Sequence, residues 1–350
     1  MKDETRQLLD WYDNNRRILP WREDPTPYHV WLSEIMLQQT RVEAVKGYYD
    51  RFTRTLPDIE ALANADEDTY LKLWQGLGYY NRVRNLHKAA VQIMEEHDGK
   101  MPRTAAELKM LAGIGDYTSA AIASIAFGES VPAIDGNLLR VWARRTLYKE
   151  NIKDGKAKKA AAPYYQERIP DDRPGDYNQA LMDLGATVCI PHGAPHCDTC
   201  PWQDCCEAHK TGVELDYPVS VSKPKRAIDQ YTVFLLHDSS GVVLHRRPDE
   251  GLLAGLYEYP NINKKLKAQE AVNYVESLGF TIRQIAGTIK AKHIFSYREW
   301  HMTGYNIEVE DVHAGEEKLI PATYEELREK YSVPSAFTKF TEALLSESGV

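Results

Sequence analysis

The chain has 350 residues, 43% of them apolar and 27% charged, and this length predicts two domains rather than one. Its 21 glycines and 18 prolines are close to average usage, which excludes fibrous and wholly disordered chains. No apolar run is long enough to cross a membrane and the N-terminus lacks a signal-peptide pattern, so we expect a cytoplasmic protein without a membrane partner. Because the net charge is -8, any polyanionic partner must be held by short basic stretches, backbone amides or helix termini.

Residues 1–216 carry apolar side chains every three or four positions, which predicts a helical domain. Within it, Thr104 and Glu107 have the spacing of a capping box, and residues 104–127 are typical of a helix-hairpin-helix. The hairpin glycines would let the backbone approach a DNA phosphate, and the amides that open the second helix would donate to that phosphate. Taken alone, the pattern more often marks a tight turn between packed helices.

Two carboxylates stand beside apolar segments of this domain. Glu34 lies in residues 30–40, whose apolar side chains cover most faces of a helix, so we expect its carboxylate at the edge of buried surface. A carboxylate there is costly unless it is paired or functional. Asp135 follows an apolar run and precedes a helix predicted over Leu138–Leu147, where aspartate is also a routine N-cap.

All five cysteines lie between positions 189 and 206, and an odd number packed so closely is not a disulfide framework. Four of them, Cys189, Cys197, Cys200 and Cys206, have intervals that suit a [4Fe-4S] cluster or a tetrahedral zinc. Spacing alone does not choose between the two metals, and Cys205 is an alternative to Cys206 as the fourth ligand.

Residues 217–229 are extended, basic and proline-containing, which indicates a linker. Over residues 230–350 the period changes to two, so we expect a second, α+β domain. Its predicted strands are Tyr231–Leu236, Val242–His245, Thr281–Thr288, Ile294–Tyr297 and Met302–Val309, and its predicted helices are Ala268–Leu278 and Ser335–Leu345.

Together these segments resemble the adenine DNA glycosylases of the MutY type, within the helix-hairpin-helix superfamily that also contains endonuclease III. The strings that carry the resemblance are Leu19–Arg22, Trp31–Thr40, Trp74–Tyr80, Leu111–Gly115, Ile134–Asn137, Asn178–Gly185 and the cysteine loop. The resemblance runs through nearly the whole chain and favours an iron-sulfur cluster over zinc. The chain departs from the family in two places: seven residues separate Cys189 from Cys197 where six are usual, and Ala112 replaces a common proline.

The resemblance implies a mainly α fold, with a glycosylase domain that carries the cluster loop and a C-terminal Nudix-like domain. It also implies base excision repair by a monomer that flips adenine out of a duplex, where adenine stands opposite 8-oxoguanine or guanine. Glu34 would protonate the departing base and Asp135 would stabilise the cationic sugar, while Asn137 and Tyr117 position Asp135 and a water. Tyr117 stands where superfamily members that cut the backbone place a Schiff-base lysine, so we expect no strand cleavage.

The resemblance also assigns binding residues. The adenine pocket would be lined by Trp21, Arg22, Leu37, Val42 and Asp183, although Trp21 and Leu37 could equally belong to the core. DNA contacts and the wedge that fills the vacated stack would come from Gln39, Thr40, Tyr79, Gly113 and Gly115, and Tyr79 has a core alternative.

The second domain most clearly resembles its family counterpart in residues 251–260. That domain would recognise 8-oxoguanine through Phe295, Ser296 and Tyr297, with Tyr297 in place of the usual histidine. Its helix offers only Glu270 and Glu276, too few carboxylates for the magnesium cluster of a Nudix hydrolase, so we expect no nucleotide hydrolysis.

Two other functions remain open from the sequence. An endonuclease III-like lyase acting on oxidised pyrimidines is disfavoured by Tyr117 and by the extra domain. A non-catalytic DNA-binding scaffold with a structural metal would explain the hairpin and the cysteines, but it leaves Glu34 and Asp135 without a role.

Overall fold

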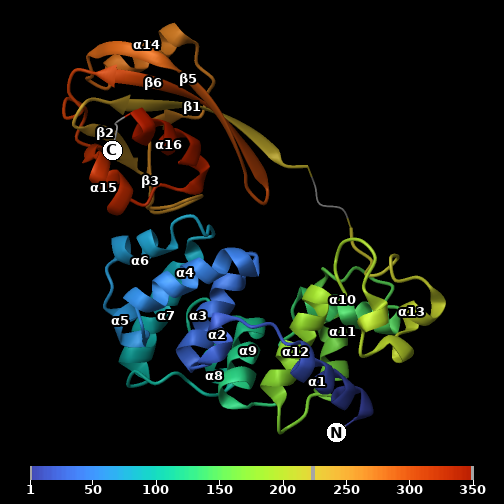
Figure 1. Cartoon of the computed structure of the whole chain (residues 1–350). Helices are drawn as coiled ribbons and strands as arrows, with labels where there is room; N and C mark the ends of the chain where they lie inside the picture. The colour runs from blue at the N-terminus through green and yellow to red at the C-terminus, as the bar shows by residue number, and fades with distance from the viewer. Residues whose placement is uncertain (1, 222–224, 348–350) are drawn as a thin grey trace. The chain divides into compact units, whose positions relative to one another are not determined.

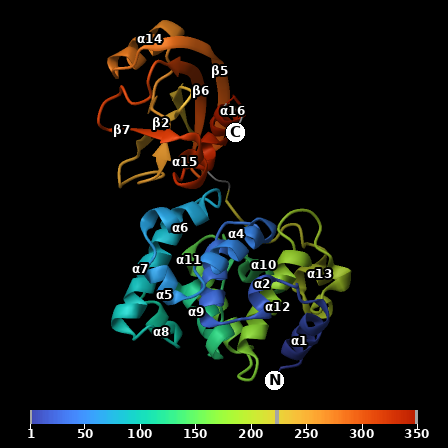
Figure 2. The same ribbon diagram turned by 60° about the vertical axis from the view of Figure 1, so that its left-hand side comes forward.

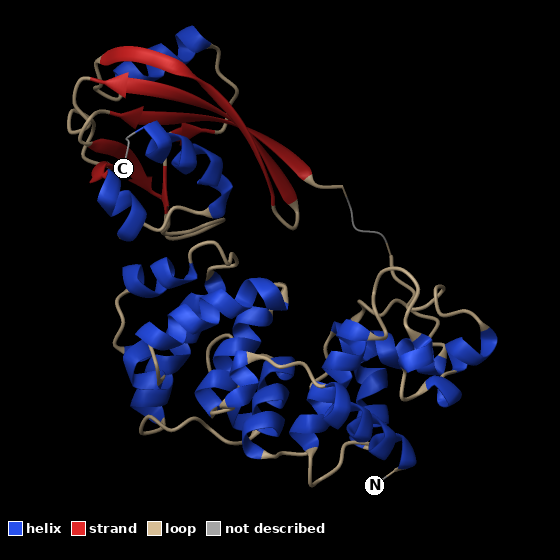
Figure 3. Ribbon diagram, in the orientation of Figure 1, coloured by secondary structure: helices blue, strands red, loops and turns tan. Residues whose placement is uncertain are grey.

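The computed structural model describes residues 2–221 and 225–347, and its contacts divide the chain into two units. Unit 1 comprises residues 1–64 and 82–222, and unit 2 comprises residues 65–81 and 223–350. The described part of unit 1 is helical, whereas unit 2 contains a sheet with helices on it (Figure 1, Figure 3). None of the described helices combines the length and the apolar character needed to span a bilayer.

Unit 1 is built from short helices joined by tight turns. Their bounds are α1 Asp3–Asn15, α2 Pro20–Glu23, α3 Pro27–Leu37, α4 Val42–Thr55, α5 Ile59–Ala63, α7 Asn81–Glu96, α8 Ala105–Leu108, α9 Asp116–Phe127, α10 Gly136–Thr146, α11 Gly155–Gln166, α12 Pro174–Thr187 and α13 Glu207–Thr211. Two 3-10 turns, Cys197–Thr199 and Gln203–Cys205, complete the cysteine loop.

Helices α3 and α9 lie at the centre of unit 1 because apolar or small side chains cover most of their faces. The first begins at Pro27 after the N-cap Thr26, whose hydroxyl accepts from His29 N at 3.2 Å. The second ends at Gly128, which adopts the left-handed conformation at φ 73°. Since α9 packs against both α3 and α12, and α12 packs against α10, side chains of four helices can meet at one site.

The predicted hairpin is confirmed. Thr104 Oγ1 accepts from Glu107 N, and the Glu107 carboxylate accepts in turn from Thr104 N, which is the reciprocal arrangement of a capping box. Gly113 has φ 73°, a conformation that favours glycine, and Gly115 is the N-cap of α9.

Unit 2 contains the strands β1 Ala227–His237, β2 Gly241–Arg246, β3 Tyr257–Glu258, β4 Asn261–Ile262, β5 Ile282–Ile294, β6 Arg298–Val309 and β7 Leu319–Thr323. The main order is β3-β2-β1-β6-β5, with β4 paired to β1 and β7 paired to β2. The central pair β1 and β6 is parallel, with Tyr231 opposite Met302, and the other pairs are antiparallel.

Two apolar cores cover the faces of this sheet. Side chains along β1 point alternately to the two faces of the sheet, so Val233 and Leu235 lie on the face that packs against Phe340 of α16 (Thr338–Glu347). Phe234 and Leu236 belong to the other core, which α14 (Ala268–Ser277) closes. The two helices therefore lie on opposite faces (Figure 1, Figure 2). The remaining helices of unit 2 are α6 Glu67–Trp74, α15 Tyr324–Glu329 and the 3-10 turn Ser335–Phe337.

The structure differs from the sequence prediction at three points of unit 2. Strand β1 begins at Ala227, within the predicted linker, of which residues 222–224 lie outside the described part. The predicted strand Ile294–Tyr297 is wrong, because Phe295–Tyr297 form the turn of one long β5–β6 hairpin. Residues 65–81 group with unit 2, where Lys72 Nζ donates to Tyr331 O at 3.1 Å and Gln75 Nε2 donates to Val333 O at 2.7 Å.

Candidate active site

Glu34 occupies the last turn of α3 and is 7% exposed. Burial raises the pKa of its carboxyl from 4.5 to about 7. The Tyr117 hydroxyl donates to Glu34 Oε2 at 2.5 Å, which opposes that rise by favouring the ionised form. A substantial fraction of Glu34 therefore holds a proton at neutral pH, where an exposed glutamate would have lost it.

Asp135 is the N-cap of α10, as the sequence predicted for an aspartate at that place. Its Oδ1 accepts from Leu138 N at 2.8 Å and its Oδ2 accepts from Asn137 Nδ2 at 2.7 Å. Burial raises the pKa of the Asp135 carboxyl, and these two hydrogen bonds oppose the rise. Asn137 thus contacts Asp135 as expected, but the Tyr117 hydroxyl bonds to Glu34 instead, because Tyr117 at the start of α9 faces α3.

The two acids line one cavity of about 200 Å³ in unit 1, here named the base pocket. Tyr117 and Asn137 also line it, as do Trp21, Arg22, Leu37, Thr40 and Val42. The sequence analysis missed Arg17, Ser33, Gln179 and Met182, which also contribute to its wall. Ser33 lies on α3, Gln179 and Met182 lie on α12, and Arg17 lies just before α2, so only the packing of these segments brings the four side chains to one wall.

Asp183 is placed differently from the prediction. It is fully buried and is not among the residues that line the base pocket. Arg22 donates two hydrogen bonds to its carboxylate, at 2.7 and 3.0 Å, and Arg17 Nε donates another at 2.7 Å. Burial would raise the pKa of Asp183, but the two guanidinium groups outweigh burial and lower it. Asp183 therefore orients Arg22, which lines the pocket, and does not itself line it.

A second cavity of about 530 Å³, here named the hairpin cleft, adjoins the base pocket and shares Glu34, Leu37, Tyr117 and Asp135 with it. Gln39, Gly113 and Gly115, three of the predicted DNA-binding residues, line this cleft. Gln39 is held in the left-handed region at φ 59°. A methyl group on Gly113 would lie 2.6 Å from Asn85 Cβ, so close packing also requires glycine there.

The predicted wedge residue Tyr79 and the loop 295–297 both belong to unit 2. The Tyr79 hydroxyl lies 3.0 Å from Ser296 Oγ. Phe295 packs edge-on against Trp300, with ring centroids 4.9 Å apart, whereas Ser296 and Tyr297 are exposed. Tyr297 is 58% exposed and carries the Arg298 guanidinium 5.1 Å from its ring centroid.

Four cysteines converge in the loop after α12. Burial raises the pKa of Cys197 to about 11 and that of Cys200 to about 12, and the thiols of Cys189 and Cys206 contribute to both rises. The Cys205 thiol instead accepts from Arg145 Nη2 at 3.1 Å. The thiols of Cys189, Cys197, Cys200 and Cys206 thus interact electrostatically with one another, which suits four donors to a thiolate-bound metal or cluster.

Two other donors lie beside this group. The ligand atoms of Cys197, His209 and Glu214 all lie within 4.8 Å of one another. His209 Nδ1 and Glu214 Oε1 are only 2.6 Å apart, so these two side chains are hydrogen-bonded to each other without a metal ion.

Helix α10 connects the cysteine loop to the catalytic candidates. Arg140 Nε donates to Cys189 O at 2.7 Å, and Arg140 Nη2 donates to Asn137 Oδ1 at 2.8 Å. Because Asn137 donates in turn to Asp135, a continuous chain of hydrogen bonds joins the loop to that carboxylate. Arg144 Nη1 also approaches Cys189 Sγ at 3.2 Å. Sequence reasoning missed these arginines, although a basic helix between Asp135 and the cysteines was a visible signal.

Two family models match the chain. The first, for HhH-GPD superfamily base excision DNA repair proteins, covers residues 32–166, and the second, for the NUDIX domain, covers residues 232–343. An adenine DNA glycosylase of Rattus norvegicus is 33% identical over 87% of this chain and 70% of its own length. One of Arabidopsis thaliana is 38% identical over 75% of this chain and 48% of its own length, so the match spans about half of that relative. A solved thermostable thymine-DNA glycosylase aligns with TM-score 0.53 and 27% identity over 59% of this chain and 95% of that one.

Proposed function

Because the chain belongs to the adenine DNA glycosylases, we propose that it hydrolyses the bond between deoxyribose and adenine mispaired with 8-oxoguanine or guanine in duplex DNA. One observation carries the proposal: a buried, protonatable Glu34 and a hydrogen-bonded Asp135 line the same pocket. That pocket opens beside a hairpin whose glycines and helix terminus suit a DNA backbone. A scaffold that only bound DNA would need neither acid.

Glu34 supplies the proton. Adenine leaves as a poor anion unless one of its ring nitrogens is protonated, and a carboxyl with a pKa of about 7 can carry that proton at neutral pH. The Tyr117 hydroxyl engages Oε2, whereas no hydrogen bond among the described residues engages Oε1. Oε1 is therefore the atom that would donate to the flipped base.

Asp135 supplies negative charge. As the base departs, the sugar becomes cationic, and a nearby carboxylate stabilises it or captures it transiently. The hydrogen bonds from Leu138 N and Asn137 Nδ2 fix both oxygens and favour the ionised form. The two acids thus differ in their hydrogen bonds: two donors hold the Asp135 carboxylate, as an electrostatic stabiliser requires, whereas Glu34 has one donor and a pKa of about 7, as a general acid requires.

Strand cleavage is not expected, because the phenol of Tyr117 cannot form the imine that a lyase needs. Lys158 lines the hairpin cleft, however, and its amine is the group that would form the imine if strand cleavage did occur. Borohydride trapping of the enzyme with its product would reveal an imine. Comparison with a Lys158→Ala variant would assign any adduct to that residue.

Cys189, Cys197, Cys200 and Cys206 would hold a [4Fe-4S] cluster, in line with the family and with their mutual proximity. When bound, the cluster would crosslink the loop at four points. Arg140 and Arg144 would then connect the loop to α10. Iron and zinc content of the purified protein, with its visible absorbance, distinguishes the cluster from zinc.

Unit 2 would recognise the base opposite adenine. Oxidation of guanine turns N7 from an acceptor into a donor, which the exposed hydroxyl of Ser296 can accept. Phe295 packs inward against Trp300, so its contribution is to hold the turn in place.

The decisive experiment incubates the protein with duplexes that carry adenine opposite 8-oxoguanine, guanine, cytosine or thymine and measures free adenine. We expect release opposite the first two and much slower release opposite the others. Glu34→Gln should abolish release while retaining duplex binding, because the amide has no proton to give but can still accept from Tyr117. Release of adenine from no duplex, or at an unchanged rate by Glu34→Gln, would refute the proposal.

A further inference from the structure

Three cavities of unit 1 succeed one another along α9. The hairpin cleft is lined by Gly115 and Thr118 at the N-terminal end of this helix. The base pocket is lined by Tyr117 and Ile125, which are about 12 Å apart along a helix axis. A third cavity of about 650 Å³, here named the rear cavity, is lined by Ile125 and Gly128 at the C-terminal end. The rear cavity thus opens at the end of α9 that is opposite to the hairpin.

The residues of α12 that line the cavities show the same order of cavities along a second helix. Its first residues, from Pro174 to Asp176, line the rear cavity, and Met182 and Ala186 line the base pocket. Gln179 lies between them and lines both cavities. Since two helices place the cavities in the same succession, the rear cavity lies directly behind the base pocket.

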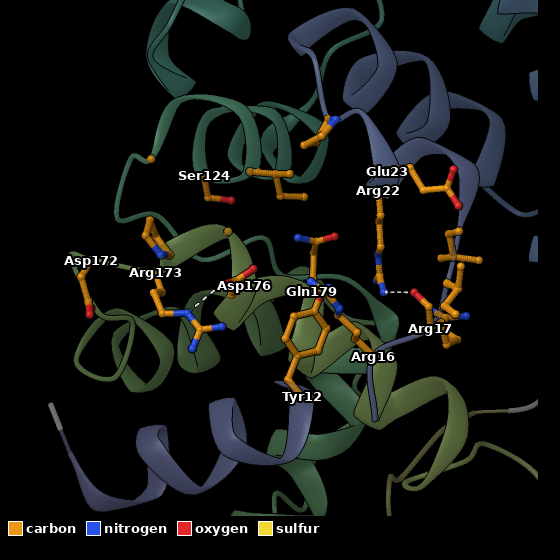
Figure 4. A pocket seen from close by; sticks show the side chains of 17 residues that line it. Tyr12, Arg16, Arg17, Arg22, Glu23, Ser124, Asp172, Arg173, Asp176 and Gln179 are labelled. Atoms are coloured by element: carbon orange, nitrogen blue, oxygen red, sulfur yellow. Dashed lines mark hydrogen bonds and ion pairs between the residues drawn. The ribbon is translucent and has the colours of Figure 1, made fainter. Parts of the chain in front are cut away.

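The wall between these two cavities consists of the residues that line both of them, which are Arg17, Leu19, Arg22, Ile125 and Gln179. Arg17 and Arg22 belong to it, and ion pairs with the buried Asp183 hold both arginines in place. The amide of Gln179, by contrast, has no hydrogen bond among the described residues, and it lies in the middle of the rear cavity lining in Figure 4. Turning the Gln179 side chain therefore breaks no hydrogen bond in the described structure, so this side chain can move more readily than the two arginines of the wall.

The lining of the rear cavity suits a planar purine. Arg22 lies over the ring of Tyr12 at 5.8 Å, and Arg16 adds a second guanidinium (Figure 4). The Tyr12 ring is buried beneath Arg22, so the exposed Arg16 is the group whose guanidinium plane can stack on a heteroaromatic ring. The carboxylate of Asp176 and the amide of Gln179 offer acceptors for an exocyclic amine.

We propose that the rear cavity is the route by which cleaved adenine leaves the enzyme, with Gln179 as the movable part of the wall. The inference rests on the proposed function, in which the product duplex still covers the hairpin cleft after the base is cut. Through that cleft adenine could leave only after the DNA, whereas the rear cavity lets the base depart while the abasic duplex stays bound. Adenine and DNA would then dissociate independently.

The test uses the whole protein saturated with a duplex that carries a stable abasic-site analogue, and the probe is tritiated adenine. The variant Arg16→Trp/Glu23→Trp places two indoles at exposed positions that line the rear cavity but not the base pocket. The control Arg103→Trp/Glu60→Trp makes the same two exchanges at exposed positions that line a different cavity of unit 1. Ile18→Trp, at a position 83% exposed on the rear cavity, is a second variant in case the double variant folds poorly.

We expect the wild-type complex and the control to bind adenine while DNA is bound, and the rear-cavity variants to associate with it at least tenfold more slowly. Single-turnover excision should stay within twofold of wild type in all variants, since none of these positions lines the base pocket. Exclusion of adenine from the wild-type complex by bound DNA would overturn the inference, as would equal association in the rear-cavity variants. Failure of the proposed function would appear separately, as no excision by the wild-type protein, because adenine binding is measured without turnover.

Discussion

At the scale of the residue, Glu34 shows a conflict between stability and chemistry. Its pKa in the folded chain, about 7, lies above the ordinary value of 4.5 because the side chain is buried. Below pH 4.5 folded and unfolded chains both hold the proton, so burial costs little. As the pH rises through 7, the folded chain must ionise a buried group, and stability is lost. The same burial that lets Glu34 hold a proton near neutral pH therefore lowers the stability of the protein between pH 4.5 and 7, and the loss persists at higher pH.

Replacing Glu34 by glutamine should therefore stabilise the protein in a pH-dependent way. The shift from 4.5 to about 7 corresponds to roughly 3 kcal/mol of unfolding free energy above pH 8, and to almost nothing at pH 4.5. Chemical denaturation of both proteins at the two pH values measures the difference. Glu60→Gln is the control, since Glu60 is exposed and should show no such dependence. An equal effect of Glu34→Gln at both pH values would contradict the burial argument.

The same pKa predicts the pH dependence of excision. Only protonated Glu34 can donate, so the single-turnover rate should fall about tenfold per pH unit above pH 7. The hydrogen bond from Tyr117 lowers the pKa of Glu34, so Tyr117→Phe should move this alkaline limb to higher pH. Rate profiles from pH 5 to pH 9 provide the measurement. A wild-type rate that stays flat or rises between pH 7 and pH 9 would exclude Glu34 as the proton donor.

At the scale of the element, the site depends on how closely α10 and α12 approach each other. Gly185 of α12 packs on Asn137, and a methyl group there would lie 2.6 Å from Asn137 Cβ. Arg140 ties the same two helices together, because its Nη2 donates to Gly185 O and to Asn137 Oδ1. Asp135 is thus fixed by a contact between helices as well as by its own helix.

Gly185→Ala should slow excision at least tenfold, because displacement of Asn137 removes a hydrogen bond from Asp135. Duplex binding should persist, since Gly185 does not line the hairpin cleft. Gly155→Ala on α11 is the matched control, because a methyl group at Gly155 meets nothing within 4 Å. The measurement compares single-turnover rates and duplex affinities of the wild-type protein, Gly185→Ala and Gly155→Ala. A wild-type rate in Gly185→Ala would disprove the positioning role of Asn137.

The elements also show what sequence can and cannot predict. The capping box at Thr104 and the N-cap at Asp135 depend on neighbours in the chain, so local pattern sufficed for both. The prediction failed at Ile294–Tyr297, where an alternating apolar pattern continues into an exposed turn. Asp183 was misplaced for another reason: its partners Arg17 and Arg22 are more than 160 positions away, and no local pattern indicates which side of an arginine faces a cavity.

At the scale of the whole molecule, the proposed function assigns base removal to one unit and base recognition to the other. The acids, the hairpin and the cysteines belong to unit 1, whereas Ser296 belongs to unit 2. The change of period near residue 230 predicted two different folds, but the grouping of residues 65–81 with unit 2 arises from contacts such as Gln75 with Val333. Helical periodicity alone could not reveal which unit that helix would contact.

This separation predicts that specificity can be changed without changing the chemistry. Ser296→Ala removes the hydroxyl that would accept from oxidised N7, and one lost hydrogen bond corresponds to a roughly tenfold smaller preference for 8-oxoguanine over guanine opposite adenine. The rate opposite guanine should change little, because Glu34 and Asp135 are untouched, and Tyr79→Phe, which removes the same contact from the Tyr79 side, measures the effect of losing that contact alone. Ser277→Ala, at the exposed end of α14, is the control in the same unit and should keep the preference. Single-turnover rates on the two duplexes measure the ratio. If Ser296→Ala slowed both reactions equally, unit 2 would contribute to binding or folding rather than to discrimination, and 8-oxoguanine would have to be recognised elsewhere.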